Sequence, residues 1–151
     1  MEPATEDLLS VLPAPGQWSD QDYLWVTRNT RRLMELAAGK LEILKTPTEE
    51  HQAIAAGIFL ALRAYLAPRG GVVHFAPLRL RVSEGRFREP DVLALLSSRD
   101  PRRGNAYWTG ADLLVEVLSA DDPDLDLITK RAEYALAPVP EYWVVDPRVR
   151  S

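Results

Sequence analysis

Short segments with apolar residues bounded by turn-forming residues run through most of this chain. Residues 33–36 and 41–44 are separated by Ala-Ala-Gly-Lys, which predicts a β-hairpin with Gly39 in the turn and Glu35 inside the first strand. Residues 78–82 alternate in polarity, as a half-buried strand does. The apolar runs together predict further strands at 72–75, 78–82, 91–96, 112–118 and 142–145.

One long segment has the three- and four-residue spacing of an amphipathic helix. It is expected to run from Thr46 to about Leu66, with Thr46 as N-cap, Pro47 at the first helical position and Glu49 completing a capping box. His51 lies at the N-terminal end of the face that would pack on the sheet. The pattern therefore predicts one helix that covers a sheet.

Two shorter helices complete the pattern and define the fold class. Ser19, with Asp22 three residues later, predicts a helix start, and a third helix is expected at about 123–136. That helix lies between the strands at 112–118 and 142–145, and a right-handed crossover would make these two strands parallel neighbours. The order of elements predicts an α+β fold with a mixed β-sheet flanked by helices.

Length and composition fit one globular domain. The chain has 151 residues, of which 46% are hydrophobic and 26% are charged. Residues 1–17 are expected to form an acidic N-terminal arm, and the domain would occupy 18–151. No apolar run approaches the roughly 20 residues of a membrane span, and the start of the chain lacks the basic residues of a secretory signal. A cytoplasmic protein without membrane contact is expected.

Charge and cysteine content limit the chemistry. The net charge of -4 argues against a protein that coats nucleic acid by bulk electrostatics, although it does not exclude a nuclease. Because there is no cysteine, any metal must be held by oxygen or imidazole ligands, which favours Mg²⁺ or Mn²⁺. Local arginine clusters occur at residues 79, 81, 86 and 88 and at residues 99, 102 and 103, and solvated surface arginines are the simplest interpretation of both.

The strongest candidate for chemistry is Glu116, a carboxylate inside the otherwise apolar strand at 112–118. A buried carboxylate needs a cation or metal partner, because desolvating it alone costs several kcal/mol. Asp91 opens a second apolar strand, and Asp126 and Lys130 lie one helical turn apart in the following helix. These four residues would meet at one edge of the sheet.

An Asp, a Glu and a Lys at one strand edge suit phosphodiester hydrolysis. Asp91 and Glu116, with the main-chain carbonyl of Val117, would supply part of the oxygen shell that Mg²⁺ prefers. Lys130 would orient or help to deprotonate the attacking water, or would stabilise the transition state as a fixed positive charge. Glu35 and His51 are expected to border this pocket, and Asp126 would support it.

Each assignment has a structural alternative. Asp91 would then cap a strand after Pro90, and Lys130 would form a surface pair with Asp126 worth about 0.3–0.5 kcal/mol. Glu35 would pair with an arginine across the sheet. His51 would be a hydrogen-bonded histidine at a helix end.

Several segments, by their order and spacing, resemble the Uma-type restriction endonuclease family of the PD-(D/E)XK nuclease superfamily. The resemblance runs from about Leu33 to Pro147 and includes a Glu-Leu-x-x-Gly element from Glu35 to Gly39. Its other parts are Pro90-Asp91-Val-Leu-Ala-Leu, Leu114-Val-Glu116-Val-Leu-Ser119, Asp126-x-x-x-Lys130-x-x-x-Tyr134, Pro140-Glu-Tyr-Trp-Val-Val-Asp-Pro147 and the helix-start His51.

This resemblance implies a restriction-endonuclease-like fold with Mg²⁺-dependent cleavage of DNA at the sheet edge. Asp91 and Glu116 match the motif carboxylates. Leu118 stands where the superfamily has its lysine, and the lysine of this family is moved to the next helix, here Lys130. A homodimer is one option for the oligomeric state.

Two features depart from the family pattern. Ala137-Pro138 stands where the family has a glycine, and the domain at 18–151 is expected to lack the C-terminal strands that the family has after Asp-Pro. The alternative function is a non-catalytic binding or assembly module that retains the nuclease fold. A hydrolase acting on another phosphoester is also compatible with these residues.

Overall fold

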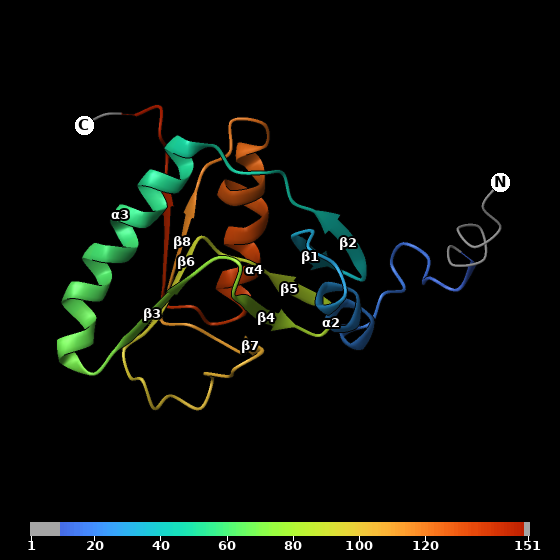
Figure 1. The fold of residues 1–151 in the computed structure, drawn as a ribbon, viewed down its shortest axis with the longest axis horizontal. Coiled ribbons are helices and arrows are strands. Elements are labelled where there is room, and N and C mark those ends of the chain that lie inside the picture. The colour runs from blue at the N-terminus through green and yellow to red at the C-terminus, as the bar shows by residue number, and fades with distance from the viewer. Residues whose placement is uncertain (1–9, 150–151) are drawn as a thin grey trace.

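A computed structural model of the chain describes residues 10–149, so the predicted acidic arm lies mostly outside the described residues. The described part contains α-helices, short 3-10 and π-helical segments, and strands in two sheets (Figure 1). The helical segments are α2 (Asp20–Arg28), α3 (Glu49–Leu66), η1 (Ala67–Arg69), η2 (Leu125–Lys130) and α4 (Arg131–Leu136). The strands are β1 (Met34–Ala37), β2 (Lys40–Ile43), β3 (Val72–Phe75), β4 (Arg79–Ser83), β5 (Arg86–Arg88), β6 (Val92–Leu95), β7 (Tyr107–Trp108), β8 (Leu113–Val117) and β9 (Glu141–Val145).

The strands form two mixed sheets. The first has the order β2-β1-β5-β4-β7 and the second has the order β3-β6-β8-β9. The predicted α+β class and the parallel pairing of β8 with β9 are confirmed, whereas the single sheet becomes two. The chain crosses between the sheets at Glu89-Pro90-Asp91, where Pro90 has no N–H for a strand ladder.

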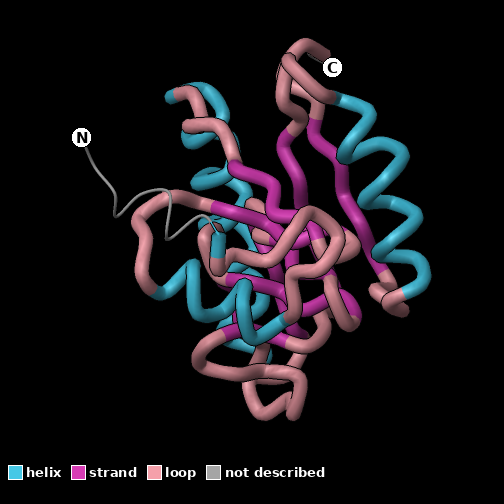
Figure 2. The backbone as a smooth tube through the Cα atoms, turned by 90° about the vertical axis from the view of Figure 1, so that its right-hand side faces the viewer, coloured by secondary structure: helices cyan, strands magenta, loops and turns pink. Residues whose placement is uncertain are grey.

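Helices cover the sheets on different sides. The long helix α3 packs along the second sheet, and α4 lies between the two sheets (Figures 1 and 2). Ile58 and Leu62 of α3 pack against a cluster that includes Val92 and Val115. On the first sheet, Tyr23 of α2 is fully buried against strands β1 and β5.

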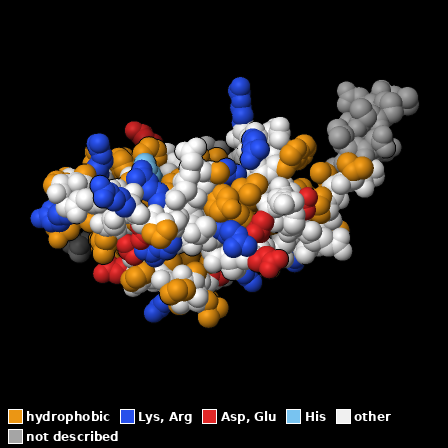
Figure 3. All heavy atoms as spheres, turned by 90° about the horizontal axis from the view of Figure 1, so that it is seen from below, with side chains coloured by type: hydrophobic (Ala, Val, Ile, Leu, Met, Phe, Trp, Pro, Cys, Tyr) orange, Lys and Arg blue, Asp and Glu red, His pale blue; other side chains and the backbone are white. Residues whose placement is uncertain are grey.

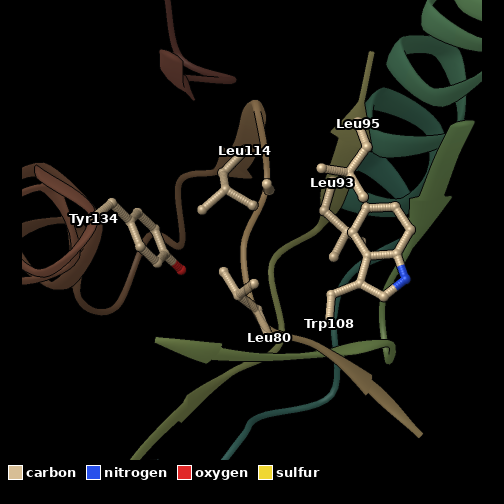
Figure 4. Close-up of a cluster of buried hydrophobic side chains, with 7 residues drawn as sticks. Leu80, Leu93, Leu95, Trp108, Leu114 and Tyr134 are labelled. Atoms are coloured by element: carbon tan, nitrogen blue, oxygen red, sulfur yellow. The ribbon is translucent and has the colours of Figure 1, made fainter. Parts of the chain in front are cut away.

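The main core lies where the two sheets face each other (Figure 4). Leu80 of β4 and Trp108 of β7 come from the first sheet, and Leu93 and Leu114 come from the second. Tyr134 of α4 joins them. Burying such side chains stabilises the fold by about 1.5–3 kcal/mol each, so this cluster holds the sheets and α4 together.

The predicted hairpin is confirmed, and its turn has a second role. Ala38 and Gly39 both have positive φ, at 50° and 75°, as a tight two-residue hairpin turn requires. The N–H groups of Gly16 and Trp18 donate to the Gly39 carbonyl at 2.9 and 3.0 Å. A Cβ at Gly39 would lie 2.5 Å from the Gly16 carbonyl oxygen, so only glycine allows this contact.

The predicted start of the long helix was wrong by two residues. The N-cap is Thr48, not Thr46, and its hydroxyl accepts a hydrogen bond from the His51 N–H at 3.2 Å. Thr48 has extended backbone angles, so Pro47 lies outside the helix. The second of the two threonines therefore caps the helix, and two acidic residues occupy the first turn, where negative charge suits the helix dipole. The capping box at Ser19 and Asp22 is confirmed.

Within the described residues, no helix has both the length and the apolar character that crossing a membrane would require.

Candidate active site

Asp91 and Glu116 lie across from each other at one end of the second sheet. Strands β6 and β8 are antiparallel with Val92 opposite Val115, so one further step places Asp91 opposite Glu116. Side chains opposite each other on antiparallel strands share a face, with Cβ atoms about 4.5–5.5 Å apart. The two carboxylates therefore face the same side of the sheet, the side that α4 covers.

The Asp91 carboxylate is held by two groups. Its Oδ2 accepts the Val117 N–H at 2.7 Å and lies 3.3 Å from His51 Nε2. The hydrogen bond to Asp91 raises the pKa of His51, against the effect of burial, and the Val117 backbone adds to this increase. Asp91, His51 and Val117 are thus in mutual contact where α3 begins and β8 ends (Figure 1).

Glu116 lies in a buried group of charged residues. Its Oε1 accepts hydrogen bonds from Lys130 Nζ and from the Tyr134 hydroxyl, both at 3.1 Å. Lys130 Nζ also lies 3.3 Å from Asp126 Oδ1 and 3.5 Å from Glu35 Oε1. Lys130 and its three carboxylate partners are all buried. The structure therefore brings together the predicted lysine and three predicted carboxylates.

A π-helical segment places the lysine. The predicted helix at 123–136 is divided into η2, a π-helix from Leu125 to Lys130, and the α-helix α4. Such π-helical turns are rare and are often found at functional sites. Asp126 and Lys130 both point inward from this wider turn, and the Tyr142 hydroxyl donates to the Asp126 carbonyl at 2.9 Å.

Burial and charge determine the protonation of these groups. Burial alone would lower the pKa of Lys130, but the charges of Glu116 and Glu35 raise it well above its usual value. Burial raises the pKa of Glu116, and the Asp91 charge raises it further, whereas Lys130 lowers it. Burial also raises the pKa of Asp126. The carboxylates around Lys130 therefore favour its protonated form.

Glu35 belongs to a buried ion-pair network, of which the sequence indicated only the pairing of Glu35 with an arginine. It lies opposite Arg88 across the β1–β5 pair, and Arg88 Nη1 donates to its Oε2 at 2.9 Å. Burial raises the pKa of Glu35, but Lys130 and Arg88 lower it to a net value below normal. Arg88 also binds Glu133 of α4 through two hydrogen bonds of 2.9 and 2.8 Å, and Glu42 at 3.0 Å.

The structure decides between the alternatives for Arg88, Lys130 and Glu35. Arg88 is not a surface arginine: it is fully buried, and three carboxylates compensate its charge. The surface-pair interpretation of Lys130 and Asp126 is also wrong, since the pair exists but is buried. The pairing of Glu35 with an arginine across the sheet is confirmed, alongside its contact with Lys130.

Sequence reasoning gave no role to Glu89 or to Tyr134, although Tyr134 belongs to one of the segments that carry the family resemblance. Glu89 is buried, its Oε2 has no hydrogen-bond partner among the described residues, and burial raises its pKa to about 8. Its N–H donates to Glu35 Oε1 at 2.8 Å. For Glu89, the signal in the sequence is its place in the Glu-Pro-Asp segment next to Asp91. For Tyr134, the signal is its spacing of four residues from Lys130, which puts both on one face of a helix.

Replacing Glu89 by glutamine is expected to remove a pH dependence of stability. The pKa of Glu89 is about 8 when folded and near 4.5 when exposed, so between these values the folded state binds the extra proton. Wild-type stability should therefore fall as pH rises from 5 to 8, by at most about 1.4 kcal/mol per pH unit from this group. Urea unfolding at each pH, with EDTA present, measures the slope.

The matched control is Glu84→Gln, in the exposed turn between β4 and β5. It removes the same charge without removing a buried group, so its slope should equal that of the wild type. Equal slopes in wild type and Glu89→Gln would show that Glu89 is ionised in the folded protein.

The oxygen donors at this end of the sheet are of the type that a hard divalent cation prefers. No group of three or more His, Cys, Asp or Glu side chains between residues 10 and 149 is arranged to hold an ion by itself. Asp91 and Glu116 are two hard oxygen donors on one face, with the Val117 backbone beside Asp91. This set fits Mg²⁺, which is commonly bound through one or two carboxylates with waters and substrate phosphate completing the shell.

The fold is that of the restriction-endonuclease-like proteins. Asp91 and Glu116 lie at one end of the two central strands of its second sheet, and Lys130 contacts Glu116 there. The model of the Uma2 family, described as "Putative restriction endonuclease", matches residues 20–151, so the chain belongs to that family. No curated protein matches the chain.

A solved structure shares the fold. It is described as a putative nuclease belonging to DUF820 from Anabaena variabilis ATCC 29413, and it is similar with a TM-score of 0.66 and 20% sequence identity. The match covers 83% of this chain and 74% of that chain. This likeness supports the fold and carries no information on activity.

Proposed function

We propose that the chain is a metal-dependent endonuclease that hydrolyses phosphodiester bonds in DNA. The observation that carries the proposal is the placement of Asp91 and Glu116 on one face, with the Lys130 ammonium 3.1 Å from Glu116. Membership of a restriction endonuclease family supports the substrate class.

Asp91 and Glu116, with the Val117 carbonyl, would hold Mg²⁺ or Mn²⁺. When bound, such an ion stabilises negative charge on phosphate oxygens and lowers the pKa of water. The chain supplies the orientation of these ligands: the Val117 N–H fixes Asp91, and the Tyr134 hydroxyl fixes Glu116. Asp126 supports the site by its contact with Lys130.

Lys130 would act as a fixed positive charge and not as a base. It lies within 3.5 Å of three carboxylates, which keep it protonated. A fixed cation next to the scissile phosphate stabilises the charge that develops in the transition state. Of the roles open to this lysine, the geometry favours this one, and His51 would hold Asp91 in place.

The experiment that tests the proposal is a plasmid-cleavage assay with the purified chain. Supercoiled DNA should become nicked or linear with Mg²⁺ or Mn²⁺, and EDTA should abolish the reaction. Absence of cleavage with either ion, while the chain is folded by circular dichroism, would contradict the proposal and favour a binding module.

The ion is also expected to stabilise the folded protein. A ligand that binds only the folded state stabilises it by about 2.7 kcal/mol at a hundredfold excess over its Kd, which raises the Tm by roughly 5–10 °C at this size. In Glu116→Gln this shift should shrink, because an amide is a weaker ligand for a hard cation. Differential scanning calorimetry with and without Mn²⁺ measures it.

Glu141→Gln is the matched control, since Glu141 is exposed on the neighbouring strand β9. It should keep the full shift. An undiminished shift in Glu116→Gln would place the ion elsewhere.

A further inference from the structure

An open pocket lies beside strand β3, apart from the carboxylates of the candidate active site. It has a volume of about 480 Å³, within the range of small-molecule sites, and the rings of His74 and Trp108 lie on its side of β3. The Trp108 ring is buried and contacts His74 edge-on, with the ring centroids 5.7 Å apart. The Phe75 ring lies on the other face of β3, against Phe59 of α3, with the ring centroids 4.8 Å apart. The lining residues are His74, Phe75, Leu78, Arg103, Gly104, Asn105 and Trp108.

The pocket also has polar groups that the protein itself leaves available. Arg103 has no carboxylate within 4.0 Å among the described residues, and its side chain binds only the Ser98 carbonyl, at 3.0 Å through Nη1. The neighbouring Arg102, by contrast, is paired with Asp100 and Asp112. Arg103 therefore offers an uncompensated positive charge to the pocket.

His74 and Trp108 provide hydrogen-bonding groups for the polar edge of a bound heterocyclic ring. Burial, together with the Arg103 charge, lowers the pKa of His74, so its neutral ring both donates and accepts hydrogen bonds near pH 7. Figure 4 shows the indole nitrogen of Trp108 on the side of the ring away from Leu114 and Tyr134. Asn105 adds an exposed amide at the rim.

We propose that this pocket binds one nucleotide, with the base against His74 and the phosphate on Arg103. An imidazole ring with a donor and an acceptor fits a planar heterocycle, because base stacking on aromatic side chains tolerates any base. An arginine without a carboxylate partner fits phosphate. Arg103 lies in the loop 96–106, and Figure 3 views the molecule from the side of this loop, where Lys and Arg side chains lie among hydrophobic ones.

The pocket is connected to the candidate active site through the backbone. Phe75 pairs with Val92 in the β3–β6 ladder, and the Ala76 N–H donates to the Asp91 carbonyl at 3.1 Å. Strand β3, which carries His74, is therefore hydrogen-bonded to the segment that carries Asp91. The nucleotide is expected to belong to a DNA strand and not to be a free mononucleotide, and only this part of the inference rests on the proposed function.

Fluorescence anisotropy with a labelled single-stranded oligonucleotide, in EDTA and at fixed salt, tests the proposal. Wild type should bind, and Arg103→Ala and His74→Ala should each raise the Kd by roughly tenfold. Arg99→Ala is the matched control, because Arg99 is in the same loop, is exposed and does not line the pocket. It should change the Kd by less than about twofold. An equal loss in Arg99→Ala and Arg103→Ala would mean binding by bulk charge and would overturn the proposal.

The indole N–H signal of Trp108 in ¹⁵N NMR provides the second measurement and needs no variant in the core. A shift of this signal with the oligonucleotide alone supports a site for a nucleotide within a strand, and a shift also with dAMP supports a site for either source. No shift with both ligands would overturn the proposal. The two proposals can fail separately, because binding is measured in EDTA and cleavage is measured with Mg²⁺. A chain that binds the oligonucleotide but does not cleave DNA with Mg²⁺ would contradict the proposed nuclease activity and would still support the nucleotide site.

Discussion

Asp91→Asn is expected to lower the rate of DNA cleavage by roughly 100-fold or more, while the chain remains folded. A metal contributes several kcal/mol to stabilising phosphoryl charge, and losing about 2.7 kcal/mol of it corresponds to that factor. Asparagine keeps one acceptor oxygen for the Val117 N–H, which Asp91 now accepts at 2.7 Å. Single-turnover plasmid cleavage measures the rate, and circular dichroism checks the fold.

Asp121→Asn provides the control for this experiment. Asp121 is an exposed carboxylate that pairs with Lys45 on the surface, so its loss should leave cleavage unchanged. If Asp91→Asn cleaves as fast as Asp121→Asn, the two-carboxylate site does not carry the activity.

Arg88→Met is expected to have the largest effect on stability, a loss of about 3–5 kcal/mol in the free energy of unfolding. The reason is that the buried Glu35 and the partly buried Glu133 would lose the cation that now binds both. Methionine fills similar volume, so the loss reports charge rather than a cavity. Urea unfolding at pH 7 measures it.

Arg86→Met is the matched variant on the same strand. Arg86 also contacts Glu133, at 3.3 Å, but its side chain is 38% exposed, so this variant should lose less than about 1 kcal/mol. Equal losses in the two variants would show that burial does not determine the strength of this network.

Most of the local elements, though not the short strands β5 and β7, and the candidate site residues could be predicted from sequence. The apolar strand at 112–118 with one carboxylate, and the helical spacing of Asp126 and Lys130, are local patterns. The structure places Asp91, Glu116 and Lys130 within one region, and their catalytic roles stay a prediction.

What could not be predicted depends on long-range packing. Nothing local distinguishes Arg88 from the exposed arginines near it, because its burial depends on Glu133, 45 residues later in the chain. The division into two sheets likewise depends on how the chain crosses at Pro90. The exact helix cap was missed because Thr46 and Thr48 have equivalent side chains, and only backbone angles separate them.

The hydrogen bond from the Val117 N–H to the Asp91 carboxylate makes this amide a natural spectroscopic reporter. Earlier in β8 the strand pairs with the backbone of β6, whereas the Val117 N–H, at the end of the strand, donates to the Asp91 side chain. A cation that draws electron density from Asp91 would weaken this bond and move the amide resonance of Val117. Occupancy of the site can thus be titrated from one signal in a protein that is neither mutated nor turning over.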